Sequence, residues 1–171
     1  MNWKLETKRL YLREFIIEDA KQMFSLNAVK EQIEYTGDEA FSSVEAAKQF
    51  LKSYSDYKNN GCGRWACITK ETQDWIGWCG LKRHEDGVVD IGYRFFKEYW
   101  GQGYATESAR ACLQYGFDVL GLEEIIGRSA KDNAASIRVL EKIGLQFWKE
   151  EDADHIENAQ IYKIDKPKIE T

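Results

Sequence analysis

The stretch Tyr99–Ala109, YWGQGYATESA, places two glycines between a strand-like run and a helix-like run. Residues 88–96 before it are mostly apolar, and residues 104–120 after it carry apolar side chains at helical spacing. A turn of this kind leaves main-chain N–H groups at the helix start without intrahelical partners, and the helix dipole adds partial positive charge there. The stretch therefore predicts a turn that binds a phosphate or pyrophosphate. A glycine-containing β-turn without a ligand is the alternative at this point.

The other predicted elements favour a single α+β domain. Ser42–Glu45 has capping-box spacing, and Asn133 precedes a helix that Gly144 ends. The predicted strands are residues 8–14, 64–69, 74–83, 88–96, 124–129, 145–151 and 158–164, and the predicted helices are residues 18–28, 42–59, 104–120 and 133–143. This order indicates a mixed sheet with helices on its faces rather than a repeated βαβ winding. We expect one domain over residues 8–165 and a mobile tail over residues 166–171.

Composition excludes several classes of partner and site. The formal net charge is -5 and no block of Lys and Arg occurs, which argues against nucleic acid as a partner. No apolar segment reaches the roughly 20 residues that span a bilayer, and the N-terminus lacks the apolar region of a signal peptide. The four cysteines form no C-x-x-C pair, and His84 and His155 are far apart and are interpreted as surface residues. We therefore expect no metal site, no membrane association and a cytoplasmic location.

Three motifs in this order resemble the GNAT N-acetyltransferase superfamily. They are Asp90–Tyr93 on the strand before the turn, the turn Trp100–Ala105, and Asn133-x-x-Ser136 ahead of Glu141–Leu145. The resemblance covers about residues 8–165 and is greatest to the branch that acetylates N-terminal amines of ribosomal proteins. It implies a GNAT-like fold, with a mostly antiparallel, twisted sheet, splayed central strands and helices on both faces. It also implies direct transfer of an acetyl group from acetyl-CoA to a primary amine in a ternary complex.

The resemblance places the donor on the glycine turn and on the strand before it. The CoA pyrophosphate would bind the main-chain N–H groups of Gln102, Gly103, Tyr104, Ala105 and Thr106. The pantetheine arm would pair like an added strand with Phe95 and Lys97, in the slot where the central strands splay. A strand N–H near Phe95 would polarise the thioester carbonyl, and Asn133 would contact the pantetheine or the thiol.

The chain also departs from the family pattern at two positions. Trp100 stands where many members have Gln or Arg, and Leu140 stands where many have a tyrosine that acts as general acid. Ser136 is then the nearest hydroxyl, and we expect it to protonate the leaving thiolate, as the resemblance to the ribosomal branch implies; a serine that only bonds back to the helix cap is the alternative. Asp90 is the favoured general base, with a solvated carboxylate at a strand start as its alternative, and Glu85 is interpreted as a turn residue.

The acceptor side is less determined by the sequence. A pocket lined by Tyr35, Phe41, Trp65 and Trp78 is expected where the first two helices meet the splayed strands, with plain core packing as the alternative. A protein N-terminus, a polyamine, an aminoglycoside or a small amine would fit the same donor machinery. Monomer and homodimer both remain open.

Two other functions compete with acetyl transfer. The spacing of Gly101, Gly103 and Thr106 superficially matches a dinucleotide-binding fingerprint, but no acidic residue follows the next predicted strand, which ends at Arg128-Ser129. The missing tyrosine at Leu140 leaves open a non-catalytic module that binds acyl-CoA.

Overall fold

A single eight-stranded sheet forms the centre of the computed structural model, which describes residues 3–28, 30–36, 38–153 and 155–168. Its strand order is β1-β2-β3-β4-β5-β6-β8-β7. The strands are β1 (Leu5–Glu6), β2 (Leu10–Arg13), β3 (Arg64–Thr69), β4 (Trp75–Arg83), β5 (Val89–Phe95), β6 (Glu124–Ser129), β7 (Gln146–Ala153) and β8 (Ile156–Asp165). Only β5 and β6 pair in parallel among these strands, so the predicted mixed, mostly antiparallel sheet is confirmed.

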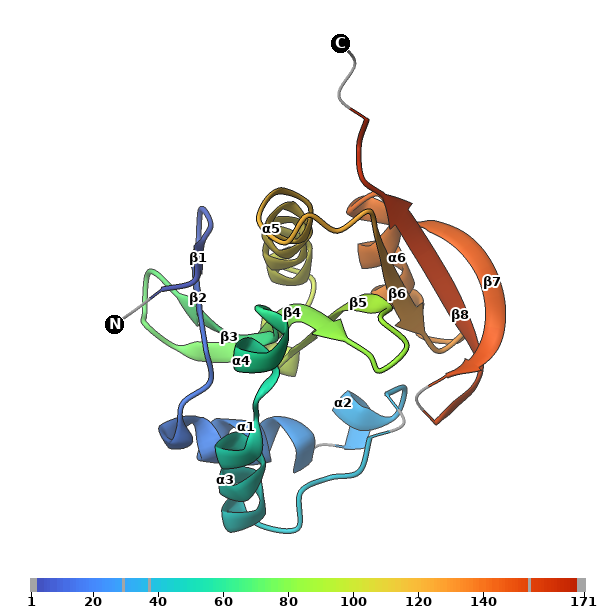
Figure 1. Ribbon diagram of the computed structural model, residues 1–171. Coiled ribbons are helices and arrows are strands. Elements are labelled where there is room, and N and C mark those ends of the chain that lie inside the picture. Colours follow the sequence, from blue (N-terminus) through green and yellow to red (C-terminus); the bar gives the residue numbers. More distant parts are fainter. Residues whose placement is uncertain (1–2, 29, 37, 154, 169–171) are drawn as a thin grey trace.

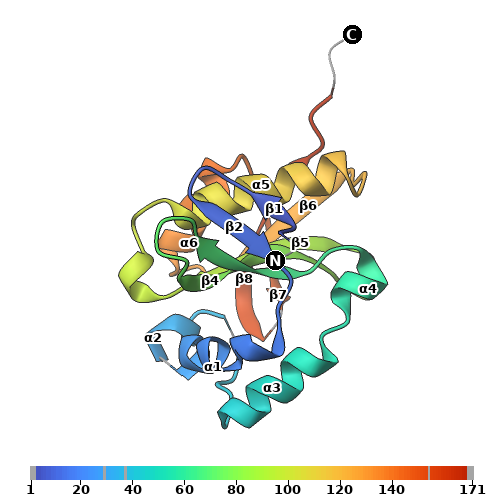
Figure 2. The same cartoon turned by 90° about the vertical axis from the view of Figure 1, so that its left-hand side faces the viewer.

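Helices cover both faces of the sheet (Figures 1 and 2). They are α1 (Ala20–Ala28), α2 (Lys30–Ile33), α3 (Val44–Ser53), α4 (Asp56–Asn60), α5 (Tyr104–Asp118) and α6 (Ala134–Lys142), with 3-10 turns at Ile17–Asp19 and Lys97–Tyr99. In Figure 1, α5 lies above β4 and β5, α6 lies beside β6, and α1 and α3 lie below the central strands. The dinucleotide-binding alternative is wrong, because β5 is the second strand of an antiparallel hairpin, and the one parallel pair, β5 with β6, is not part of a repeated βαβ winding among the described strands.

Each face of the sheet has its own core. Side chains alternate along a strand, so neighbours in sequence reach opposite faces. On β3, Trp65 joins the cluster beneath α5 and α6, while Ala66 joins the cluster beneath α1 and α3. The four cysteines are buried and unpaired. Cys67, Cys79 and Cys112 therefore serve as small core residues, as predicted.

The splay expected of the central strands occurs between β5 and β6. These strands pair only at Asp90↔Ile126 and Ile91↔Gly127. Beyond Ile91 the two strands separate, while β5 continues to pair with β4 as far as Gly77↔Phe95. The half of β5 that precedes the glycine turn therefore has one paired edge and one open edge.

Several element boundaries differ from the sequence-based prediction. The helix predicted over residues 42–59 is two helices, α3 and α4, because the chain is extended at Tyr54. The cap of α3 is Ser43, whose side chain accepts the Ala46 N–H, so the predicted cap was one residue early. The two-residue strand β1 and the single turn α2 were not predicted, because elements this short leave no periodic signal.

One main-chain hydrogen bond fixes the chain where it leaves the sheet after β8. The Lys166 main-chain N–H donates to Glu123, which holds the chain beside β6 just after β8. Residues 169–171 of the predicted tail lie outside the described residues, so the mobility of that tail stays a prediction. No helix in the described part of the chain is long and apolar enough to cross a membrane.

Candidate active site

The glycine turn opens α5 with main-chain N–H groups that have no partner. Gly101 (φ 73°) and Gly103 (φ 83°) both adopt the left-handed conformation that glycine tolerates best. Gly103 is the N-cap, and its carbonyl accepts the first helical hydrogen bond from Glu107. Within the described residues, none of the N–H groups of residues 102–106 donates to another group. The turn thus presents the converging donors that an anion requires.

Arg9, which lies just before β2 and was not singled out from the sequence, holds this turn in place. Its guanidinium donates to the Gln102 carbonyl (2.9 Å), lies over the Tyr104 ring and pairs with Glu107 (2.7 Å). Burial raises the pKa of Glu107, but hydrogen bonds from Thr7 and Arg9 outweigh burial and lower it. Arg9 offsets this negative charge at a helix start where an anion is expected. The pairing spans almost a hundred residues, so no local pattern could have indicated it.

The open edge of β5 presents main-chain groups of Tyr93 and Phe95. The Phe96 N–H donates to Ile76 on β4 (3.0 Å), and hydrogen-bonding direction alternates along an antiparallel strand. The amides of Phe95 and Tyr93 therefore face away from β4, toward the side from which β6 has separated. Lys97, expected to continue this edge, instead begins a 3-10 turn, and its carbonyl accepts the Trp100 N–H.

The start of α6 lies across the splay from β5. The Asn133 side chain accepts the Ser136 N–H (3.2 Å), so Asn133 caps the helix. Tyr93 reaches over from β5, and its hydroxyl donates to the Ser136 carbonyl (2.9 Å) and lies 3.3 Å from the Ser136 hydroxyl. Burial raises the pKa of Tyr93 above its ordinary value. Since the phenol has one proton, the serine hydroxyl is the donor in the second contact. Ser136 was predicted to be a site residue, whereas Tyr93 was noted only as part of the motif Asp90–Tyr93, without a role.

Asp90 lies in a buried cluster of charges on the opposite face of the sheet. One carboxylate oxygen accepts from Arg64 (2.6 Å), and the other accepts from His84 (2.8 Å) and lies 3.6 Å from Arg128. Burial alone would raise the pKa of Asp90, but the charge of Arg64 and the hydrogen bond from His84 hold that pKa well below its ordinary value. A carboxylate so stabilised is a weak proton acceptor. The surroundings of Asp90 contradict the predicted base role, and they also contradict the solvated alternative.

The same cluster explains the glycine in the motif Asp90–Tyr93. A Cβ at Gly92 would lie 2.6 Å from the guanidinium carbon of Arg64. Glycine therefore leaves the space through which Arg64 reaches Asp90. His84, expected at the surface, is mostly enclosed, with 17% of its side chain exposed. Glu85 is exposed in the hairpin turn, as interpreted from the sequence.

The aromatic residues proposed for an acceptor pocket do not share one cavity. Trp65 is fully buried on the α5 side and packs edge-on against Tyr115, so its assignment to the acceptor pocket is wrong. Trp78 lies on the other face, half-buried between the guanidinium groups of Arg64 and Arg94, each 5.4 Å from its ring. Tyr35 is exposed beyond α2.

Phe41 also belongs to the side of Trp78, but it contributes to packing. It joins the partly buried side chains of the cluster beneath α1 and α3, with its ring 5.5 Å from that of Phe50. Beside this cluster, the buried Arg94 donates to the side chains of Asn27 and Asp38. Arg94 thus ties the loop before α3 and the helix α1 to β5, on the face opposite α6.

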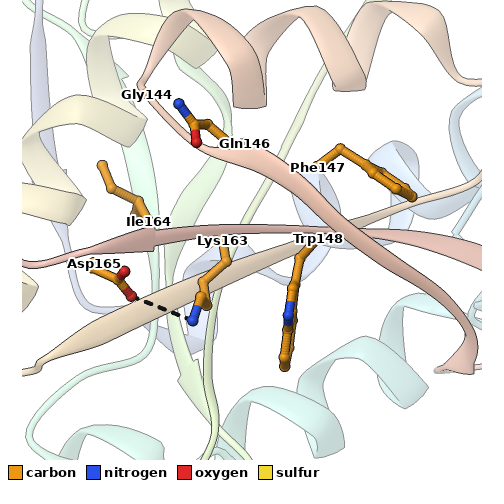
Figure 3. Close-up of a pocket in the computed structure, with 7 residues that line it drawn as sticks. All are labelled: Gly144, Gln146, Phe147, Trp148, Lys163, Ile164 and Asp165. Carbon is orange, nitrogen blue, oxygen red and sulfur yellow. Dashed lines mark ion pairs between the residues drawn. The ribbon is translucent and has the colours of Figure 1, made fainter.

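The pocket shown in Figure 3 lies away from these groups. It has a volume of about 380 Å³ and lies on β7 and β8. Its lining residues are Gly144, Gln146, Phe147, Trp148, Lys163, Ile164 and Asp165. None of them belongs to the glycine turn, to β5 or to the start of α6. Among the described residues, no group of three or more acidic, histidine or cysteine side chains is arranged to hold a metal.

Comparison with known proteins gives consistent matches over most of the chain. A family model described as an acetyltransferase (GNAT) domain matches residues 9–146. The uncharacterized N-acetyltransferase p20 of Bacillus licheniformis is 32% identical over 145 residues, which are 83% of this chain and 82% of that relative.

Solved structures extend the match to the three-dimensional fold. A GNAT-family acetyltransferase from Bacillus anthracis superposes with a TM-score of 0.80 at 26% identity, covering 95% of this chain and 98% of the other. The ribosomal-protein-S5-alanine acetyltransferase of Vibrio fischeri superposes with a TM-score of 0.76 at 18% identity, covering 95% and 96%. At that lower identity the likeness concerns the fold alone.

Proposed function

This chain belongs to the GNAT acetyltransferase family, and from that premise we propose that it transfers the acetyl group of acetyl-CoA directly to an α-amine. The observation that carries the proposal is the set of unpartnered main-chain N–H groups on the turn at residues 102–106 and on the open edge of β5. Only residues 96–101 separate these two stretches in the chain, which suits one extended donor molecule that binds both. The diphosphate of CoA suits the turn, and the amides of its pantetheine arm suit the strand edge.

Ser136 supplies the proton for the leaving group in this proposal. The nitrogen of a neutral amine attacks the thioester carbonyl, a C–N bond forms and the C–S bond breaks. The Ser136 hydroxyl gives its proton to the thiolate and regains one from the attacking nitrogen, so the products are an N-acetyl amide and free CoA. The N–H of Tyr93 or Phe95 on the open edge is suited to stabilise the negative oxygen of the intermediate. Ser136 is suited to this role because Tyr93 holds it beside the splay.

The acceptor class follows from the state of the predicted bases. Asp90 is ion-paired and Glu85 is exposed in a turn, so neither is placed to deprotonate the acceptor. In this proposal the amine therefore arrives in its neutral form. A terminal α-amine has a pKa of about 8, whereas an alkyl amine such as that of lysine has one of about 10.4. At neutral pH the neutral fraction of an α-amine is therefore larger by about two orders of magnitude, which supports a peptide N-terminus over a polyamine.

The test is to incubate the protein with acetyl-CoA and a panel of amines, and to measure thiol release and acetylated product by mass spectrometry. We expect peptides with free N-termini to be acetylated faster than spermidine, and we expect the rate to rise with pH as the amine loses its proton. Thermal stabilisation by CoA without thiol release across the whole panel would instead favour the non-catalytic acyl-CoA-binding module. A polyamine acetylated faster than every peptide would overturn the acceptor class alone.

A further inference from the structure

Trp100 makes a hydrogen bond at the very edge that the proposed donor would use. Its indole N–H donates to the Phe95 carbonyl at 2.8 Å, and its main-chain N–H donates to the Lys97 carbonyl at 3.1 Å. The residue as a whole is 48% exposed. The indole therefore bonds to β5 through its nitrogen while much of its surface remains in contact with solvent.

The Phe95 carbonyl has no strand partner, and its hydrogen bond comes from the Trp100 side chain instead. Phe96 takes the hydrogen bond to β4, so the carbonyl of Phe95 faces the open edge. The pairs between β5 and β6 end at Ile91, four residues earlier. A carbonyl at such an edge is an acceptor for any N–H donor that enters the splay, and the indole of Trp100 is the donor that occupies it here.

We propose that Trp100 competes with the pantetheine arm for the carbonyl of Phe95. This inference rests on the proposed function, because it takes the open edge of β5 as the place where the arm binds. In the free protein the indole N–H satisfies the carbonyl. When the donor binds, an amide N–H of the arm takes that carbonyl, and the indole turns out to the solvent that it already partly contacts.

The competition predicts a selective effect on ligands that carry the arm. Trp100→Phe keeps an aromatic ring but removes the indole N–H. The pantetheine arm then binds a Phe95 carbonyl that no side chain already occupies, so no hydrogen bond has to be broken first. A net hydrogen bond of about 1 kcal/mol corresponds to a change in affinity of about fivefold. We expect Trp100→Phe to bind CoA about fivefold more tightly than the wild-type chain does. ADP has the diphosphate but no pantetheine, so its affinity is expected to be unchanged.

The experiment is calorimetric titration of the wild-type chain and of Trp100→Phe with CoA and with ADP. Trp148→Phe is the matched control, because Trp148 is also half-exposed (49%) but lies on β7, away from the donor edge. We expect the control to bind both ligands like the wild type. Thermal unfolding of the three proteins establishes that each one is folded at the titration temperature.

The outcomes separate this inference from the proposed function. Equal or weaker CoA binding by Trp100→Phe would overturn the competition, and so would an equal gain for CoA and ADP, which would indicate a change in the turn itself. A wild-type chain that binds neither ligand would overturn the proposed function, and the inference with it. An independent readout is the indole N–H signal of Trp100 in ¹⁵N-labelled protein, identified by its loss in Trp100→Phe. That signal should shift on addition of CoA and not on addition of ADP.

Discussion

The two sides of the candidate site are built from different chemical groups. The donor side consists of main-chain amides, on the turn at residues 102–106 and on the edge of β5, which no strand or helix uses. The side predicted for the acceptor, on the face of the sheet covered by α1 and α3, consists of charged and polar side chains that are already paired with one another, with Asp90 and Arg94 as the buried centres of two clusters. The difference teaches that one side is prepared for a ligand, whereas the charges on the other side chiefly hold the fold together.

If this contrast holds, the largest effect on stability comes from the acceptor side. Asp90→Ala leaves the guanidinium of Arg64 largely buried without its counter-ion. We expect the free energy of unfolding to fall by about 3–5 kcal/mol, measured by urea denaturation. Glu151→Ala is the control, because its pair with Lys149 is exposed and is expected to contribute less than about 1 kcal/mol. Equal losses in the two variants would remove the structural role assigned to Asp90.

Acid should weaken the Asp90 cluster in a defined direction. The folded-state pKa of Asp90 is lowered, by Arg64 and His84 acting against the effect of burial. Since the unfolded-state pKa of an aspartate is about 3.9, the cluster contributes its full stability above that pH and loses it progressively as the pH falls below it. The stability difference between the wild type and Asp90→Ala should therefore shrink below about pH 4. A difference that stays constant down to pH 3 would contradict the lowered pKa.

Catalysis should depend on a hydroxyl that contributes little to stability. Ser136→Ala removes the proposed proton donor but leaves the main-chain N–H that Asn133 caps. We expect kcat to fall about 10²-fold, with the KM for acetyl-CoA and the melting temperature nearly unchanged. Tyr93→Phe keeps Ser136 and removes the phenol that holds it, so kcat should fall less, by about fivefold. Steady-state kinetics measure both variants. An unchanged kcat in Ser136→Ala would exclude it as the acid.

The same contrast explains which parts of the site could be predicted from the sequence. The glycine turn could be predicted because its conformation follows from neighbouring residues: Gly101 and Gly103 occupy left-handed positions, and the helix start supplies the free N–H groups. The splay and the donor edge came from the family resemblance, and the pairing of β5 with β6 confirms the splay.

The side-chain partners could not be read from local patterns. Arg64 and Asp90 are 26 residues apart, and Arg9 and Glu107 are 98 apart, so only the assembled sheet brings them together. Asp90 was expected to be a base. This prediction was wrong because the position of a carboxylate in the sequence does not indicate which counter-ions surround it in the fold. Trp65 was misassigned because the facing of its side chain depends on the register between β3 and β4. That register places Trp65 opposite Cys79, and therefore on the other face from Trp78.

A smaller but sharper test compares two glycines that differ only in where they lie. Gly101 (φ 73°) and Gly121 (φ 65°) both adopt left-handed conformations, and a Cβ at either one would meet no atom within 4 Å. Alanine at either position should therefore cost a similar stability of about 1–2 kcal/mol through backbone strain alone. Only Gly101→Ala strains the turn that carries the donor amides, so only this variant should weaken acetyl-CoA binding. If the turn relieves roughly 1.4 kcal/mol of strain by rotating those amides away from the ligand, the affinity falls about tenfold. Calorimetric titration measures both variants. If Gly121→Ala weakens acetyl-CoA binding as much as Gly101→Ala does, the loss of affinity reflects general destabilisation, and the glycine turn has no special part in binding.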